Sequence, residues 1–174
     1  LLEGKIGFVL DVYKRSIEGL IFNPPFSGAA GNAFASYRNV ASMDNTGWDL
    51  GLTYRGNISS DLGFNATLNL AHYKNEITNL DGEATSVFPP GIDKRFGEVN
   101  VWRVGYPISS FYGYTNDGIF QDQAEVDALD QTGSGIGRYR RKDINGDGRI
   151  TGDDQGVIGN PHPDITMGLN LGLD

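Results

Sequence analysis

The sequence predicts an all-β fold, and within that class one part of an antiparallel transmembrane β-barrel. The 174-residue chain contains 25 glycines together with two Trp, eight Tyr and nine Phe, which favours strands joined by tight turns. Apolar and polar residues alternate with a period of two in four separate segments, the pattern of strands with one apolar face. Long and short connections alternate between these segments. We therefore expect several antiparallel strands, one large loop and only a minor helix.

The first two expected strands are residues about 5–20 and 39–54, joined by a long loop, residues about 21–38, that is rich in Gly, Pro, Asn and Ser. On the first strand Asp11 lies on the polar side. The apolar positions of the two strands are Ile6, Phe8, Leu10 and Val12, then Trp48, Leu50, Leu52 and Tyr54. The intervening positions of the second strand are Gly47, Asp49, Gly51 and Thr53.

The other two expected strands are residues about 63–76 and 164–174. A short polar turn, Arg55–Gly63, leads into the first of them, and a loop of residues about 77–163 separates the two. Their apolar positions are Phe64, Ala66, Leu68 and Leu70, then Ile165, Met167, Leu169, Leu171 and Leu173.

Alternation of this kind also occurs in soluble sandwiches and small barrels. Three details favour a membrane barrel. The apolar runs approach the roughly 9 to 11 residues that a tilted strand needs to cross a bilayer. The opposite faces hold Gly, Asn, Thr and Asp instead of the Lys and Glu of a soluble exterior. Aromatic residues gather near the segment ends, as in the girdles of membrane barrels; these are Tyr13, Phe22, Tyr54 and Tyr73.

The alternation of short and long connections also predicts a topology. Outer-membrane barrels have short periplasmic turns and long external loops, so residues 5–20 and 63–76 are expected to run outward, and 39–54 and 164–174 inward. Four strands cannot close a barrel, and lipid cannot hydrogen-bond an open sheet edge. We therefore expect residues 1–174 to be a fragment whose remaining strands lie elsewhere in a longer chain, and the start of the sequence agrees with an internal position.

Charge and composition exclude several classes of function. The formal charge is −8, and residues 117–154 contain nine acidic against five basic residues, which argues against a nucleic-acid partner. The chain has no cysteine, so disulfides, thiolate metal sites and thiol nucleophiles are excluded within it. No stretch approaches the roughly 18 to 20 apolar residues of a membrane-spanning helix, and no signal peptide is recognised.

Four stretches, in order and spacing, resemble one known family. They are Asn39–Leu50, Arg103–Tyr114, Asp117–Gln121 and the run from Arg141 to Asp164. Each is similar to the C-terminal barrel region of SusC/RagA-type TonB-linked outer-membrane proteins, and the resemblance covers the chain from about residue 5.

The resemblance implies a transport component and not an enzyme. Its implied place is the cell outer membrane, in the β-barrel of a TonB-dependent receptor that imports oligosaccharides or peptides. The implied partners are the rest of its own barrel and plug, a SusD-like surface lipoprotein, membrane lipid, and the TonB complex acting through the absent N-terminal part. The resemblance assigns no substrate-binding residues here.

Residues 143–154, DINGDGRITGDD, have the spacing of an EF-hand calcium loop. Calcium takes about six to eight oxygen ligands, which a twelve-residue loop supplies from positions 1, 3, 5, 7, 9 and 12. Those positions hold Asp143, Asn145, Asp147, the Arg149 carbonyl, Thr151 and Asp154. The expected cofactor is a structural Ca²⁺ ion. Asp154 departs from the pattern, because an EF-hand places a longer Glu there.

A simpler interpretation is that Asn145–Gly148 is only a turn, because Asn-Gly and Asp-Gly are strong turn signals. The alternative function is a soluble calcium-binding, dockerin- or EF-hand-like β-module of an extracellular carbohydrate-handling protein. That module would need a second loop and a helix after the first, and neither is recognised. The one expected helix, Asp122–Asp130, precedes the loop and begins with a capping box of Asp122 and Glu125.

No catalytic constellation is recognised. His162 lies between two prolines and His72 late in a strand, and neither has the partners of a catalytic histidine. Aromatic residues of the long loop have two interpretations: they pack the core of the loop, or they stack on sugar rings. These residues are Trp102, Tyr106, Phe111, Tyr112 and Tyr114.

Overall fold

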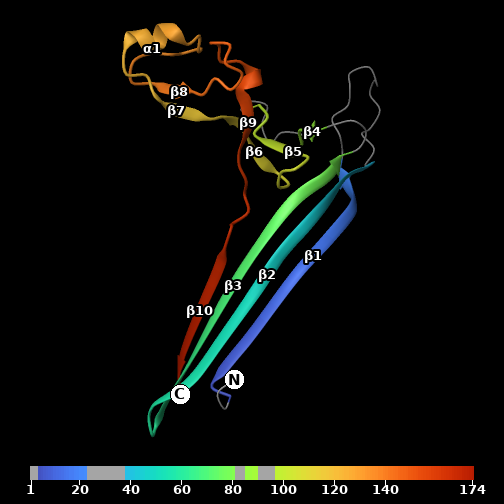
Figure 1. Ribbon diagram of the computed structural model, residues 1–174, viewed down its shortest axis with the longest axis vertical. Helices are drawn as coiled ribbons and strands as arrows, with labels where there is room; N and C mark the ends of the chain where they lie inside the picture. Colours follow the sequence, from blue (N-terminus) through green and yellow to red (C-terminus); the bar gives the residue numbers. More distant parts are fainter. Residues whose placement is uncertain (1–3, 23–37, 81–84, 90–96) are drawn as a thin grey trace.

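The computed structural model describes residues 4–22, 38–80, 85–89 and 97–174. Figure 1 shows a long twisted sheet that carries a smaller lobe at one end, with both chain termini near the opposite end. The expected loop at 21–38 lies almost wholly outside the described residues.

The long sheet contains four strands in the order β1–β2–β3–β10, and all neighbouring strands are antiparallel. They are β1 (Ile6–Phe22), β2 (Arg38–Ser59), β3 (Leu62–Leu80) and β10 (Thr166–Leu173). The predicted all-β, antiparallel fold class is confirmed. The sheet is open at β1 and β10, so it forms a piece of barrel wall and not a closed barrel.

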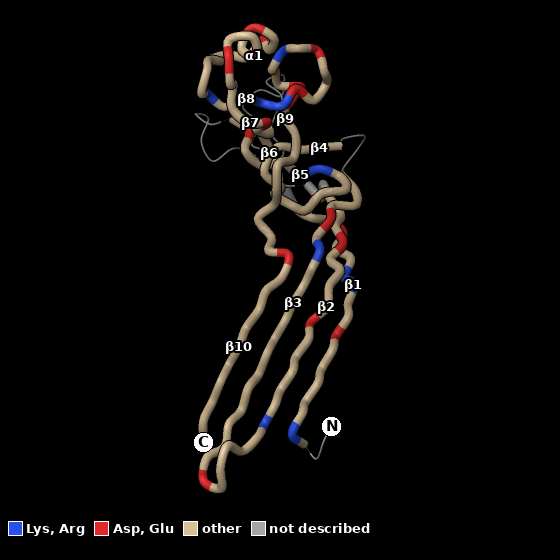
Figure 2. Tube along the Cα trace, turned by 60° about the vertical axis from the view of Figure 1, so that its left-hand side comes forward, with Lys and Arg blue, Asp and Glu red and all other residues tan. Residues whose placement is uncertain are grey.

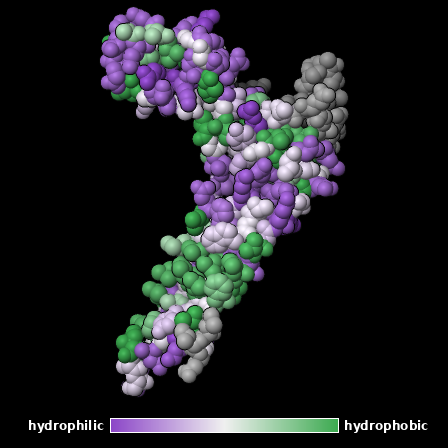
Figure 3. Space-filling model, viewed as in Figure 1, coloured by the Kyte–Doolittle hydropathy of each residue, from purple (hydrophilic) through white to green (hydrophobic). Residues whose placement is uncertain are grey.

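The strand register places the alternating apolar residues on one face, called the outer face below. In one row across the sheet, Leu10 pairs with Leu50, Leu50 with Leu70, and Leu70 with Met167. These side chains are open to the surroundings: Met167 is 70% exposed. Figure 3 shows the result, a band of hydrophobic residues across the sheet below the polar lobe.

β2 and β3 run further than the sequence pattern indicates. They reach Ser59 and start again at Leu62, so the turn between them is only Ser60–Asp61. The residues from Arg55 onward lack a continuous apolar face. They remain in strands because the backbone pairing between β2 and β3 continues as far as Ser59 and Leu62.

The lobe replaces the expected large loop with short strands. A second antiparallel sheet has the order β4–β5–β6–β9, and β7 pairs with β8. The bounds are β4 (Ser86–Val87), β5 (Asn100–Arg103), β6 (Ser110–Tyr114), β7 (Asn116–Ile119), β8 (Tyr139–Arg141) and β9 (Gln155–Gly159). The helices are α1 (Gln123–Ala128) and the 3-10 helix η2 (Gly152–Asp154).

The sequence signal for the helix start is correct. Asp122 is the N-cap of α1 and accepts a hydrogen bond from the Glu125 backbone N–H at 2.9 Å. The Glu125 carboxylate reaches back to the Gln121 N–H at 2.8 Å instead of that of Asp122. The described residues contain no helix both long and apolar enough to cross a membrane.

A small core joins the lobe to the end of the long sheet. Ala41, Ile77 and Leu80 are buried there. The partly buried residues packed against them are Leu20, Val87, Trp102 and Ile108. The lobe therefore rests on the ends of β2 and β3 through side-chain packing as well as through its covalent connections.

Candidate functional site

The long sheet has a second, polar face, called the inner face below. Its rows include Asp11 opposite Asp49, and Thr53 opposite Thr67. Small residues such as Gly51 lie between these rows and help form a hollow of about 630 Å³. Alternation of an apolar outer face and a polar inner face is the pattern of a membrane barrel around an aqueous interior.

Aromatic pairs mark both ends of the apolar band. Near the lobe, the Trp48 and His72 rings lie 6.1 Å apart between centroids, and near the termini Tyr54 and Phe64 lie 5.4 Å apart. One row beyond Trp48 the outer face becomes charged, beginning with an ion pair between Lys14 and Asp44 at 2.8 Å. Figure 2 shows the same boundary, with few charges along the middle of the strands and many above them.

The calcium-type loop, residues 143–154, is closed by its own acidic side chains. The two Asp143 carboxylate oxygens accept hydrogen bonds from the Gly146 and Gly148 N–H groups at 2.7 and 2.8 Å. Asp147 accepts from the Arg149 N–H at 2.8 Å. Gly146 and Gly148 have φ angles of 76° and 77°, a left-handed conformation that favours glycine.

Asp154 ties the two ends of this loop together. Its carboxylate is fully buried and accepts hydrogen bonds from the Ile144 N–H at 2.9 Å and the Thr151 N–H at 2.8 Å. Thr151 is also the N-cap of η2, and its hydroxyl accepts from the Asp153 N–H. The backbone hydrogen bonds from Thr151 and then Ile144 lower the pKa of Asp154, against the opposing effect of desolvation.

The expected metal ligands therefore lie together in one loop, and their oxygen atoms match the ligand type that calcium prefers. Their arrangement fits the ion less well. Among the residues that the structure describes, no three Asp, Glu or His side chains converge on one metal position. The carboxylates of Asp143, Asp147 and Asp154 instead accept backbone N–H groups, and the Arg149 guanidinium pairs with Asp130 at 3.1 Å.

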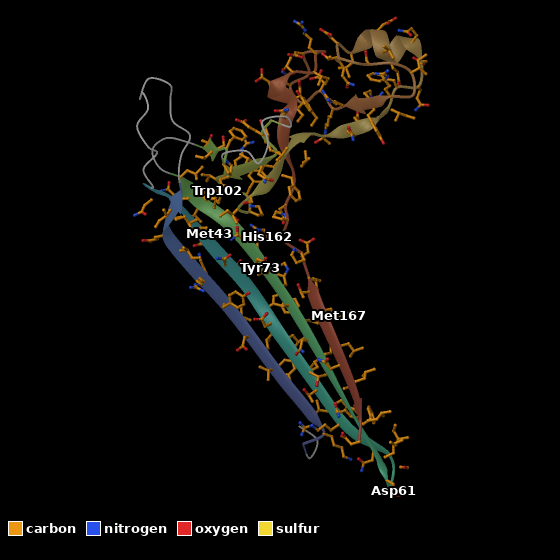
Figure 4. All side chains as sticks on the ribbon, turned by 180° about the vertical axis from the view of Figure 1, so that it is seen from behind. Met43, Asp61, Tyr73, Trp102, His162 and Met167 are labelled. Carbon is orange, nitrogen blue, oxygen red and sulfur yellow. The ribbon has the colours of Figure 1, made fainter. Side chains whose placement is uncertain are left out.

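Sequence reasoning did not connect the chain's two histidines with the return of the lobe to β10. Tyr73 Oη and His162 Nδ1 lie 2.9 Å apart, with the rings edge to face. His72 Nδ1 hydrogen-bonds the carbonyl of Asp164, two residues after His162. Figure 4 shows Tyr73 and His162 together beside β3. No spacing rule relates residue 73 to residue 162, so only the folded chain reveals this contact.

The loop aromatics pack mainly against neighbours. Tyr112 contacts Phe88 edge to face at 5.0 Å, and Arg141 lies 4.1 Å from the centre of the Tyr114 ring. Trp102 packs on the joining core. Tyr106 and Phe111 keep more than a third of their surface exposed, so they are the two of this group most open to a partner or solute.

Comparisons with known proteins find relatives that match nearly the whole chain. The chain is similar to TonB-dependent receptor P3 of Formosa agariphila, with 28% identity over 99% of this chain. It is similar to TonB-dependent receptor SusC of Bacteroides thetaiotaomicron, with 24% identity over 97% of this chain. It spans only 18% and 16% of the lengths of these relatives. No family model matches the chain.

Solved structures share the fold. The RagAB peptide transporter superposes with a TM-score of 0.70 at 24% identity, over 98% of this chain and 17% of that one. The RagAB peptide importer in its open-open state gives a TM-score of 0.72 at 24% identity, over 99% of this chain and 17% of that one. The relatives are named as receptors or transporters and not as enzymes. Along nearly its whole length the chain is thus similar to outer-membrane TonB-dependent receptors such as SusC, and it shares its fold with the matching part of the RagAB transporter.

Proposed function

We propose that this chain supplies part of the barrel wall and an external lobe of a transporter that imports oligosaccharides or peptides across the outer membrane. The observation that carries the proposal is the sheet with an apolar outer face and a polar inner face, in a chain similar to receptors over nearly its whole length. Because the chain spans less than a fifth of its relatives, transport is proposed for a complete receptor that contains it.

The proposal also implies how the sheet is oriented in the outer membrane. The tight turn at Ser60–Asp61 faces the periplasm and the lobe faces outward, so β1 and β3 run outward through the membrane. A SusD-like lipoprotein would meet the lobe side, while the plug and the TonB complex act through chain outside residues 1–174. Under this proposal the chain is not the alternative, a soluble calcium-binding module.

Uptake by cells tests this function. A strain lacking the receptor gene would be compared with a complemented strain, using fluorescent peptides and oligosaccharides of matched size. We expect complementation to restore uptake of one class, and removal of TonB or of the neighbouring lipoprotein gene to abolish it. If the two strains take up peptides equally well and also take up oligosaccharides equally well, the proposal is contradicted.

We further propose that residues 143–154 bind a structural Ca²⁺ ion. The proposal is supported by the oxygen donors at Asp143, Asn145, Asp147, Thr151 and Asp154 and by glycine at both sharp turns. These carboxylates accept backbone N–H groups in the structure. Binding requires Asp143 and Asp147 to give up some of these hydrogen bonds so that their oxygens can coordinate the ion. Its role would be to order the acidic lobe, because Asp130 bonds to both Gly148 and Ile150 through the backbone.

Calorimetry on the intact receptor tests this ion directly. We expect a calcium-dependent heat that disappears in Asp143→Ala and Asp147→Ala and persists in Asp153→Ala, which removes an exposed neighbouring carboxylate. Absence of that heat in the unaltered receptor leaves the loop as a turn closed by N–H groups alone.

A further inference from the structure

Residues 104–110, called the shelf here, pair through their backbone with the edge of β3 and reach its inner face at Asn75, at the lobe end of the sheet. The backbone of Ile77 exchanges two hydrogen bonds with the shelf: its N–H donates to the Tyr106 carbonyl and its carbonyl accepts from the Gly105 N–H, both at 2.9 Å. Side chains on alternate positions of β3 face the same side of the sheet. Tyr73, Asn75 and Ile77 therefore form one continuous row under the shelf.

Asn75 is the centre of this attachment. Its side chain is only 4% exposed. Its Oδ1 accepts a hydrogen bond from the Ile108 N–H at 2.8 Å, and its Nδ2 donates to Asn45 Oδ1 at 2.7 Å. Asn45 and Asn75 are also directly paired between β2 and β3. One buried amide thus links the shelf to two strands of the wall, and an apolar side chain of similar size cannot replace it.

His162 makes a second contact between the shelf and β3. His162 Nε2 lies 3.3 Å from the Ile108 carbonyl, while its Nδ1 lies 2.9 Å from Tyr73 Oη. Ile108 itself packs on the core formed with Ile77 and Leu80. The shelf is therefore held through its backbone, through hydrogen bonds to side chains and through apolar packing.

The shelf also contains a strained residue. Ser109, with φ 57°, is the one non-glycine residue with positive φ among those that the structure describes. The next residue, Ser110, is fully buried, and its hydroxyl donates to the Pro107 carbonyl at 2.6 Å. Backbone strain of this kind persists only where the surrounding structure determines the conformation, and it is frequent at functional sites.

We propose that the shelf is a fixed constriction on the inner wall at the external end of the barrel, and that Asn75 is the positioning residue that holds it there. The inference rests on the proposed transport function, because it treats the inner face as the path of a solute. The shelf limits the size of solutes that enter from outside, while the rest of the lobe projects beyond it.

Hydrogen exchange on the complete receptor tests the positioning role. In Asn75→Ala we expect the amides of Ile77, Gly105 and Ile108 to exchange roughly tenfold faster, the effect of losing one buried hydrogen bond. Asn75→Asp should rescue much of the protection, because the carboxylate still accepts from Ile108 and the Asn45 amide can rotate to donate. Asn170→Ala, on the same face of β10 and exposed, is the control.

A labelling assay tests the constriction. Residues 1–174 contain no cysteine, so a single Asn69→Cys on the inner face can be introduced into a receptor freed of other cysteines. Intact cells would be treated from outside with maleimides attached to polyethylene glycol of increasing size. We expect Asn75→Ala to admit larger reagents than the unaltered receptor and Asn75→Asp to restore the original limit. Tyr73→Phe, which removes only a hydroxyl, should give an intermediate limit.

The outcomes separate this inference from the proposed function. Leu68→Cys, on the outer face, should remain unlabelled by every water-soluble reagent; labelling equal to that of Asn69→Cys overturns the barrel itself. If Leu68→Cys is protected but Asn75→Ala keeps the unaltered exchange rates and both Asn75→Ala and Tyr73→Phe keep the unaltered size limit, the barrel stands and the shelf proposal is wrong. Should Asn75→Ala fail to reach the membrane, Tyr73→Phe still decides between these outcomes.

Discussion

Asp154 shows how one residue can serve two structural purposes within the calcium-type loop. Its carboxylate caps η2 at Thr151 and, on its other oxygen, holds the Ile144 backbone near the start of the loop. A glutamate at this position would need a different backbone path to make the same two short contacts. The aspartate that departs from the EF-hand pattern is thus the residue that closes this loop without an ion.

Replacing Asp154 by Asn tests that role. The amide can present only one acceptor oxygen, so one of the N–H groups of Ile144 and Thr151 should lose its partner. We expect faster hydrogen exchange at these two amides in buffer containing a calcium chelator. Asp153→Asn, which alters the exposed neighbour, should leave both amides unchanged. Equal exchange in the two variants would mean that Asp154 does not tie the loop.

The same carboxylate predicts a pH dependence. Because its hydrogen bonds lower the pKa of Asp154 below the ordinary value of 3.8, the ionised group stabilises the folded loop. That contribution is fully present above the unfolded pKa and is lost as the pH falls through the folded one. We expect protection of the Ile144 and Thr151 amides, corrected for intrinsic exchange, to stay constant between pH 7 and pH 5 and to decrease below about pH 4. Asp154→Asn should remove this dependence.

At the residue scale, sequence reasoning could place the loop but not its hydrogen bonds. The spacing of Asp143, Asn145 and Asp147 is visible in the sequence, and Gly146 and Gly148 indicate the turns. The direction of the Asp154 carboxylate depends on the three-dimensional path of the loop. The contacts of Asn75 with Ile108 and of Tyr73 with His162 join residues 33 and 89 positions apart, and no local pattern encodes them.

At the scale of elements, alternation decides which face of each strand meets lipid. Leu169 on β10 is 59% exposed and pairs with Leu68 on the outer face, while the next residue, Asn170, pairs with Thr67 on the inner face. Leu169→Arg should therefore destabilise the receptor by about 2 to 4 kcal/mol, as a cation near the bilayer centre does, whereas Asn170→Arg should have little effect. Urea unfolding of the receptor in lipid vesicles measures both. Equal effects of the two changes would show that the faces are assigned wrongly.

At Gly47 on β2, atoms of both neighbouring strands, β1 and β3, leave no room for a side chain. An added Cβ would lie 2.5 Å from the His72 carbonyl and 2.6 Å from the Tyr13 hydroxyl. Gly47→Val should therefore force the strands apart and destabilise the wall by about 1 to 3 kcal/mol. Gly51→Ala is the matched control, because its Cβ would meet nothing closer than 3.6 Å. The same vesicle unfolding assay compares them.

The long strands were accessible to sequence reasoning and the lobe was not. A period of two over many residues gives a strong signal, which is why the faces of Leu10, Leu50 and Leu70 follow directly from the sequence. The strands of the lobe have two to five residues, too few for a period to appear. Their pairing joins Tyr112 with Val157 across a long stretch of chain, a contact set by tertiary packing.

For the whole molecule, the important feature is an outer face that no part of the described chain covers. Val12, Met167, Leu171 and Leu173 are each at least 70% exposed, and the two edges of the sheet, β1 and β10, are open to further strands. Soluble proteins rarely expose a continuous apolar surface of this extent. Lipid on this face and neighbouring strands at both edges account for the two features together.

This arrangement predicts how residues 1–174 behave when they are produced alone. In water, the apolar face and the unpaired edges should drive association, so we expect aggregates that a mild detergent converts into dispersed, β-rich protein. Sedimentation with and without detergent, followed by circular dichroism, measures this.

A triple variant tests the role of the outer face. Replacing Val12, Leu169 and Leu171 together by Thr introduces a residue that is common in strands and makes the outer face less apolar. That triple variant should stay in solution longer than a control with Thr53, Thr67 and Asn170 changed to Ser on the inner face. A soluble monomer formed by the unaltered chain without detergent would contradict a lipid-facing wall, because a soluble fold must cover its apolar face with other parts of the same chain.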